Sequence, residues 1–232
     1  MKIKLFLFLI LLPAVAFSQV KRSGLSIGVN FGNWIGDTEM FALSFADEMN
    51  SVSGFSGFDF ESGARIGLSI IAFTEYPVTK SFMILPELGY TQRGIMFSGD
   101  GTYSVYGDSY QVDADMTFQL DYIDAALLLK YHVGTGNIKP YLIAGPGAGY
   151  LISSKMKVDV SIEGESESET EDMEPGSEYD VNLNIGAGID ISDLTRLELQ
   201  YSSGFMSILD DDPQDDIKYT NEGLCISIAV YF

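Results

Sequence analysis

Large apolar residues alternate with small or polar residues along most of the chain. The clearest example is the last stretch, where Leu224, Ile226, Ile228, Val230 and Phe232 are separated by small, polar or amphipathic residues. This period of two predicts a β-strand with one apolar face. A strand of about nine residues crosses a bilayer when it is tilted. The stretch therefore favours a strand that faces lipid.

The same alternation predicts eight strands in all. They cover residues 24–34, 62–73, 81–94, 119–133, 138–153, 179–191, 194–203 and 224–232. The segments between them alternate in length: long ones at 35–60, 95–118, 154–178 and 204–218, and short ones at 75–80, 134–137 and 192–193. Outer-membrane barrels show this asymmetry because tight turns face the periplasm and long loops face outside. The pattern predicts an all-β fold, an antiparallel up-and-down eight-stranded transmembrane β-barrel.

The polar face of the predicted strands carries charges near the strand centres. These residues are Arg65, Glu87, Arg93, Asp124, Lys130, Arg196 and Glu198. A soluble sandwich or ligand-binding barrel would bury the apolar face instead, and alternation alone does not separate the two orientations. The charges favour the membrane barrel, because an eight-stranded lumen is just wide enough for side chains and opposite charges can pair there. We expect these residues to form a lumen charge network.

The first residues have the features of a signal peptide. Lys2 and Lys4 precede an apolar run at 5–12, and the small residues Ala16 and Ser18 predict cleavage after Ser18. Residues 1–18 would then be removed and residues 19–232 would form the barrel domain. This removal would lower the 13 basic residues to 11 against 33 acidic ones and change the net charge from −20 to −22. Such a charge argues against nucleic acid as a partner.

Three segments resemble the PorT-like outer-membrane β-barrel family, which is widespread in Bacteroidetes. Residues 86–90 (PELGY), 121–131 (DYIDAALLLKY) and 139–146 (KPYLIAGP) are similar to its PEL-Y, YLEIPLLLKY and PYL-AGP strands. Asp124 stands where the family usually has Glu, and Ala126 where it usually has Pro. The resemblance implies an eight-stranded barrel in the outer membrane, in contact with its lipid. It implies little about activity, because the family is defined by its fold.

The last stretch adds a second resemblance. Alternating apolar residues that end at Phe232 are similar to the closing strand of bacterial outer-membrane barrels. The resemblance implies that the barrel-assembly machinery recognises residues 224–232 during insertion.

The sequence indicates neither an enzyme nor a cofactor. Cys225 is the single cysteine, which excludes an intramolecular disulfide and a cysteine-based metal site. Lipid enzymes and proteases of the barrel type need a histidine beside a nucleophile at the outer rim. His132, the single histidine, precedes a short turn and so lies at the periplasmic end. We predict that it is an inward or rim polar residue without a catalytic role.

Acidic residues gather in two of the predicted long loops. The aspartates Asp210, Asp211, Asp212, Asp215 and Asp216 form a calcium candidate, because Ca²⁺ takes several carboxylate oxygens, but they lack the EF-hand spacing. A solvated loop is the competing interpretation. The run at 163–172 either extends a hairpin beyond the membrane or is disordered.

Three functions remain open at this point. The preferred one is a structural or interaction role in the outer membrane, in which the acidic outer loops contact an envelope or surface protein. The second is a barrel for small-solute transport or ligand binding, against which the expected lumen ion pairs argue. The third is an outer-leaflet lipid-modifying enzyme, against which the position of His132 argues.

Overall fold

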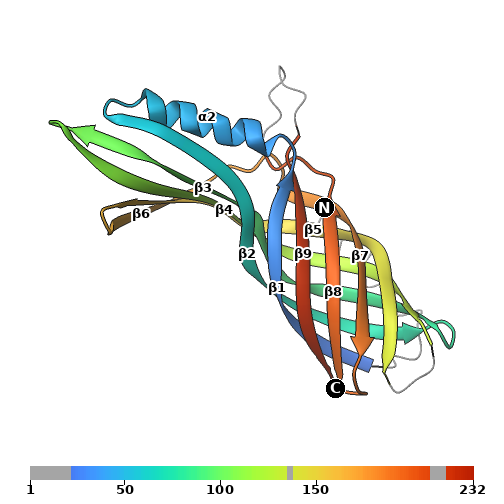
Figure 1. The fold of residues 1–232 in the computed structure, drawn as a ribbon. Coiled ribbons are helices and arrows are strands. Elements are labelled where there is room, and N and C mark those ends of the chain that lie inside the picture. The colour runs from blue at the N-terminus through green and yellow to red at the C-terminus, as the bar shows by residue number, and fades with distance from the viewer. Residues whose placement is uncertain (1–21, 135–137, 210–217) are drawn as a thin grey trace.

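Eight antiparallel strands close into a barrel in the computed structural model, which describes residues 22–134, 138–209 and 218–232 (Figure 1). They are β1 (Arg22–Ile35), β2 (Phe55–Pro77), β3 (Phe82–Val105), β4 (Asp108–His132), β5 (Lys139–Ile162), β7 (Tyr179–Asp190), β8 (Thr195–Gly204) and β9 (Thr220–Tyr231). Neighbours in this order pair, and β9 pairs with β1 to close the ring. The predicted eight-stranded barrel is confirmed. A further strand, β6 (Glu165–Asp172), pairs with β5 outside the ring, and α2 (Thr38–Ser51) is a helix.

The apolar face of the strands points outward. On β9 the side chains of Leu224, Ile226, Ile228 and Val230 are 39–54% exposed. On the neighbouring strand β1, Ile27 and Val29 pair with Ile228 and Ile226. The inward positions of the same strands hold small or polar residues such as Ser26 and Asn30, which are buried. A band of exposed aliphatic side chains around a polar interior is the arrangement that a bilayer stabilises. Among the described residues, no helix is both long and apolar enough to span a membrane.

Ile226 provides a test of this orientation, because it lies near the middle of β9 between Val29 and Leu199 and points outward. We expect Ile226→Arg to lower the free energy of unfolding in lipid vesicles by about 2–4 kcal/mol, since a cation near the bilayer midplane loses its hydration. Denaturant titration of the refolded protein measures this change. Ser168→Arg, on exposed β6, is the control and should change the value by less than about 0.5 kcal/mol. Equal losses in the two variants would contradict the orientation.

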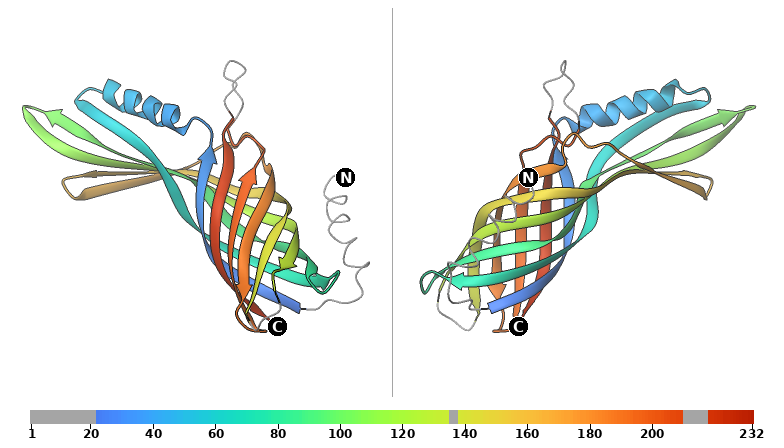
Figure 2. Two further views of the ribbon diagram at one scale, coloured as in Figure 1. Left: turned by 45° about the vertical axis from the view of Figure 1, so that its right-hand side comes forward. Right: turned by 180° about the vertical axis from the view of Figure 1, so that it is seen from behind.

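The strands β2, β3, β4 and β5 are 23–25 residues long. They continue well beyond the barrel wall on one side (Figure 2). β3 and β4 pair without interruption from Phe82↔Tyr131 to Val105↔Asp108, and β6 pairs with the outer part of β5. We call this extension the outer platform; it consists of α2, β6 and residues 55–64, 95–105, 108–120 and 154–162. It lies at the end of the barrel opposite the short turns (Figures 1 and 2).

The outer platform corrects the predicted loops. Residues 35–60 hold α2 and the start of β2, and residues 95–118 form the outer half of the β3–β4 hairpin. Both loop predictions were wrong, because the many Gly, Ser and Asp residues hide the apolar spacing. For the run at 163–172 the hairpin alternative is correct. The predicted turn at 75–80 begins too early, because β2 continues to Pro77.

The outer platform has a hydrophobic core of its own. α2 packs Phe41 against Phe97 with ring centroids 5.4 Å apart, and Trp34 lies 4.9 Å from Phe118. These separations lie in the range where tilted aromatic pairs are favourable. The helix begins at Asp37, whose carboxylate accepts a hydrogen bond from the Met40 amide at 3.0 Å. The platform is therefore a packed substructure rather than a set of free loops.

Candidate functional site

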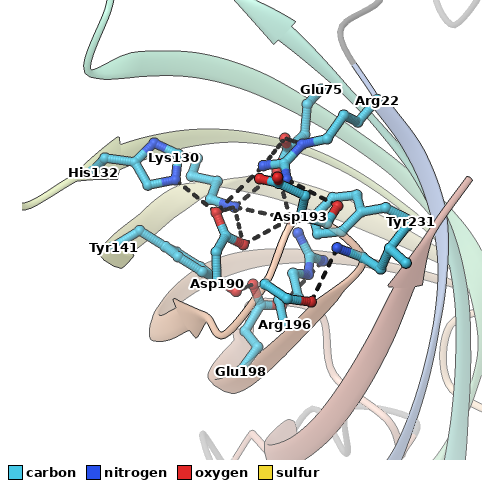
Figure 3. A network of polar contacts seen from close by, with 12 residues as sticks. Arg22, Glu75, Lys130, His132, Tyr141, Asp190, Asp193, Arg196, Glu198 and Tyr231 are labelled. Atoms are coloured by element: carbon cyan, nitrogen blue, oxygen red, sulfur yellow. Dashed lines mark hydrogen bonds and ion pairs between the residues drawn. The ribbon is translucent and has the colours of Figure 1, made fainter. Parts of the chain in front are cut away.

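A charged network fills the lumen at the end of the short turns (Figure 3). Lys130 lies at its centre, with its Nζ 2.8 Å from Glu75 Oε1 and 3.2 Å from Asp190 Oδ1. The Lys130 and Glu75 side chains are fully buried. The Tyr231 hydroxyl donates to Asp190 at 2.8 Å and accepts from Lys130 at 3.2 Å. Each buried charge thus has an opposite charge and a hydrogen bond, which buried ions require.

Two further basic side chains, those of Arg22 and His132, contact the same carboxylates. Arg22 donates from Nε to Glu75 at 3.1 Å, and its guanidinium stacks 3.9 Å from the centroid of the Tyr231 ring. His132 Nε2 lies 2.9 Å from Asp190 Oδ2. His132 is therefore inside the barrel and buried, at the end away from the outer platform. This position agrees with an inward polar role.

Arg196 holds a second set of carboxylates in the lumen. Its Nη2 lies 3.4 Å from Glu87 and 3.5 Å from Glu198, and its guanidinium stacks 3.8 Å from the centroid of the Phe73 ring. The Tyr141 hydroxyl donates to Glu198 at 2.8 Å. One cation therefore holds two acidic side chains together in the interior.

Arg93 joins two other strands toward the outer end of the barrel. It forms ion pairs with Asp124 at 2.7 Å and with Asp180 at 2.8 Å. Its guanidinium lies 4.9 Å from the centroid of the Tyr122 ring, and Tyr122 belongs to the core of the outer platform. Arg93 thus connects the charged lumen to the aromatic core above it.

A small cavity separates the Arg93 pairs from the carboxylates held by Arg196. Its volume is about 50 Å³, and most of the residues that line it carry polar side chains. The polar lining residues are Asn30, Ser69, Glu87, Thr91, Arg93, Asp124, Asn182, Asn184, Gln200, Ser202 and Cys225. A polar cavity of this size has room for about three or four water molecules. It is too small for a nutrient-sized solute.

The structure divides the seven predicted lumen charges into four groups. Glu87, Arg196 and Glu198 lie together, and Arg93 pairs with Asp124. Lys130 pairs instead with Glu75 and Asp190, and Arg65 pairs at 3.7 Å with Asp121. None of these three carboxylates is among the predicted residues.

Four of the missed residues could have been found from the alternation of inward and outward positions along the strands. Glu75 lies an even number of residues from Arg65, and Asp180 and Asp190 lie even numbers of residues from the inward Asn182. Side chains spaced in this way along a strand point to the same face. Arg22 is in phase with the inward Ser26 in the same way. The predicted turn at 75–80 includes Glu75, and the predicted network covers only the strand centres, whereas inward positions continue to the strand ends.

Two other predictions concern residues that the structure does not describe. The calcium candidate at 210–216 and the signal peptide at 1–18 lie outside the described residues. Within the described ranges, no group of three or more His, Cys, Asp or Glu side chains is arranged to hold a metal ion.

Together, the outward apolar band and the paired charges inside define a transmembrane β-barrel of the outer-membrane type. The chain belongs to the outer membrane protein beta-barrel domain family, whose model matches residues 17–210. This family places the protein in the outer membrane, in contact with lipid. No curated protein matches the sequence significantly.

Solved structures of outer-membrane barrels are similar to this chain at low identity. Ail, the attachment invasion locus protein of Yersinia pestis, is 14% identical, with 92% of this chain and 100% of Ail covered and a TM-score of 0.39. Neisserial surface protein A is 13% identical, with 90% and 97% covered and a TM-score of 0.41. The N-terminal β-barrel domain of Pseudomonas aeruginosa OprF is 13% identical, with 92% and 100% covered and a TM-score of 0.32. At these identities the likeness concerns the fold alone.

Proposed function

We propose that this protein is a non-conducting, non-enzymatic barrel that holds the outer platform at the cell surface to bind another protein. The observation that carries the proposal is the separate core of the platform. Phe41, Phe97 and Phe118 pack there although closing the barrel does not require them. A packed surface projecting from a rigid scaffold is typical of binding elements.

The filled lumen supports the first part of the proposal. Ion pairs centred on Lys130, Arg196 and Arg93 occupy successive levels of the interior, and the cavity between them is about 50 Å³. An eight-stranded barrel leaves little space beyond its own side chains. Solute transport is the less favoured function for this reason.

The route to the membrane is part of the same proposal. Cleavage after Ser18 would release residues 19–232 in the periplasm, and the barrel-assembly machinery would recognise β9 through its outward apolar row. Membership of the PorT-like branch of outer-membrane barrels, with an origin in Bacteroidetes, is proposed from residues 86–90, 121–131 and 139–146.

Planar-bilayer recording tests the closed lumen. We expect no resolved conductance steps from the wild type, because charged pairs block the lumen at more than one level. Arg93→Ala should also remain silent, because the pairs around Lys130 at the opposite end stay in place. Resolved steps in the wild type that change in Arg93→Ala would overturn this part of the proposal and favour transport.

A further inference from the structure

A groove runs along the face of the outer platform that carries its core, since Val160 and Ile162 line the groove and also pack against that core. One hollow of about 570 Å³ is lined by Tyr103, Tyr110, Val160, Ile162, Glu163, Glu165 and Glu167. A second hollow of about 450 Å³ is lined by Val158, Val160, Glu167, Ser168 and Glu169. The two hollows share Val160 and Glu167, so they form one continuous groove, which we call the acidic groove. Its floor consists of half-buried valine and isoleucine side chains of β5.

One wall of the acidic groove is a row of glutamates on β6. Glu165, Glu167, Glu169 and Glu171 pair in register with Ile162, Val160, Val158 and Met156. Side chains opposite each other in paired strands share a face, so the four carboxylates stand beside the apolar floor. All four are exposed, and in the part of the chain that the structure describes none of them forms an ion pair.

The basic residues closest in sequence lie on the other face of the β5–β6 hairpin. Lys157 pairs with Thr170 across the two strands and donates a hydrogen bond to Asp159 at 2.7 Å. This hydrogen bond, with a second one from Ser168, holds the pKa of the Asp159 carboxyl below its usual range. Lys157 is therefore engaged on the face opposite the glutamates and does not neutralise the groove.

The outer edge of β6 is unpaired in the described sheet, where β6 is the terminal strand. Its backbone N–H and C=O groups can therefore accept another extended chain. A second copy of this protein is a poor candidate, because pairing two β6 strands would bring their glutamate rows together, and like charges across strands are destabilising. The charge row thus disfavours self-pairing and favours a cationic strand.

We propose that the acidic groove binds an extended cationic segment of a partner protein, with Lys or Arg at every second position, by strand addition to β6. The glutamates repeat every second residue, which is about 6.8 Å along a strand, and an added strand repeats its side chains at the same interval. Its basic residues would face the carboxylates across about 5 Å. This inference rests on the proposed surface-binding function and names the chemistry of the partner.

A synthetic peptide tests the inference on the full chain in nanodiscs. The probe is a capped, fluorescent peptide of about nine residues that alternates Lys and Val, enough to span β6. The groove variant combines Glu165→Gln, Glu167→Gln, Glu169→Gln and Glu171→Gln. The control variant removes the same number of charges from exposed positions elsewhere on the platform: Asp47→Asn, Glu48→Gln, Asp113→Asn and Asp115→Asn.

We expect the groove variant to weaken peptide binding by at least about tenfold and the control variant to weaken it by less than about threefold. Both variants lose long-range electrostatic attraction, but only the groove variant loses direct ion pairs with the peptide. Fluorescence anisotropy measures both dissociation constants. The substituted side chains are exposed, so both variants should keep the gel mobility of the folded barrel. Equal weakening in the two variants would overturn the proposal.

Strand addition itself has a separate readout. Peptide binding should slow amide hydrogen exchange along β6, and a peptide with alternate N-methyl groups on its pairing edge should bind at least about tenfold more weakly at unchanged charge. Unchanged exchange on β6, or pairing of two copies of the chain instead, would overturn the inference. The conductance recording tests the non-conducting barrel of the proposed function independently of the groove. Failure of peptide binding with a silent barrel would therefore overturn the groove alone, whereas resolved conductance steps would overturn the proposed function.

Discussion

Lys130→Met is expected to lower the free energy of unfolding of the barrel by about 3–5 kcal/mol, because it leaves buried carboxylates without their cation. Lys130 contacts both Glu75 and Asp190, and all three side chains are buried in the lumen. Arg22 reaches the same two carboxylates, but from the end of the barrel and with a partly exposed side chain. It can therefore offset only part of the loss. Denaturant titration in lipid vesicles measures the change.

Lys157→Met is the matched control for this experiment. Lys157 pairs with Asp159 on the exposed face of the outer platform, where an ion pair contributes at most about 1 kcal/mol. A second check combines Lys130→Met with Asp190→Asn, which removes one unpaired charge and should recover part of the lost stability. If Lys130→Met is no more harmful than Lys157→Met, the lumen network does not hold the barrel together.

Trp34→Ala is expected to destabilise the outer platform by about 3–5 kcal/mol, the cost of removing a large aromatic side chain from a packed core. Trp34 is 3% exposed and contacts the rings of Phe41, Phe118 and Tyr219. Because Phe41 is the contact on α2, loss of Trp34 should release this helix. Hydrogen exchange of the α2 amides measures that release.

The barrel itself should survive Trp34→Ala, since its strand pairing and lumen ion pairs are unchanged. The control is Phe205→Ala, which removes an aromatic side chain that is already 61% exposed and should leave α2 protected. Unchanged exchange of α2 in the Trp34→Ala variant would show that the helix does not depend on this core. Loss of the folded barrel would show that platform and barrel fold as one unit.

Period-two alternation was enough to predict the barrel. The eight predicted strands all exist, because strands that face lipid on one side and a crowded polar lumen on the other must alternate strictly. The outer platform was missed because its strands are not bounded by a bilayer. Gly99 and Gly101 of β3, for example, interrupt the apolar row opposite Ala114 and Val112 of β4, and such residues are also typical of loops.

The helix was missed for a related reason. Phe41, Phe45 and Met49 repeat every four residues, which is helical spacing, but they lie in a segment rich in Ser and Asp. The sequence predicts that charged residues pair inside the lumen, but it predicts only some of the residues that take part. Which acid pairs with Lys130 depends on barrel closure, which brings Glu75 of β2 and Asp190 of β7 together across the lumen. The alternation along a strand predicts which side chains point into the lumen, but it does not predict which of them pair with one another.

The apolar face of the barrel strands should meet lipid, whereas the aromatic core of the outer platform should not. Tryptophan quenching by brominated lipids tests this expectation directly, because Trp34 is the single tryptophan. In a Trp34→Phe background, fluorescence of the Ile226→Trp variant in vesicles should fall strongly when brominated lipids replace ordinary ones. Fluorescence of Trp34 in the wild type should change little. Quenching of Trp34 without quenching of the Ile226→Trp variant would contradict the account.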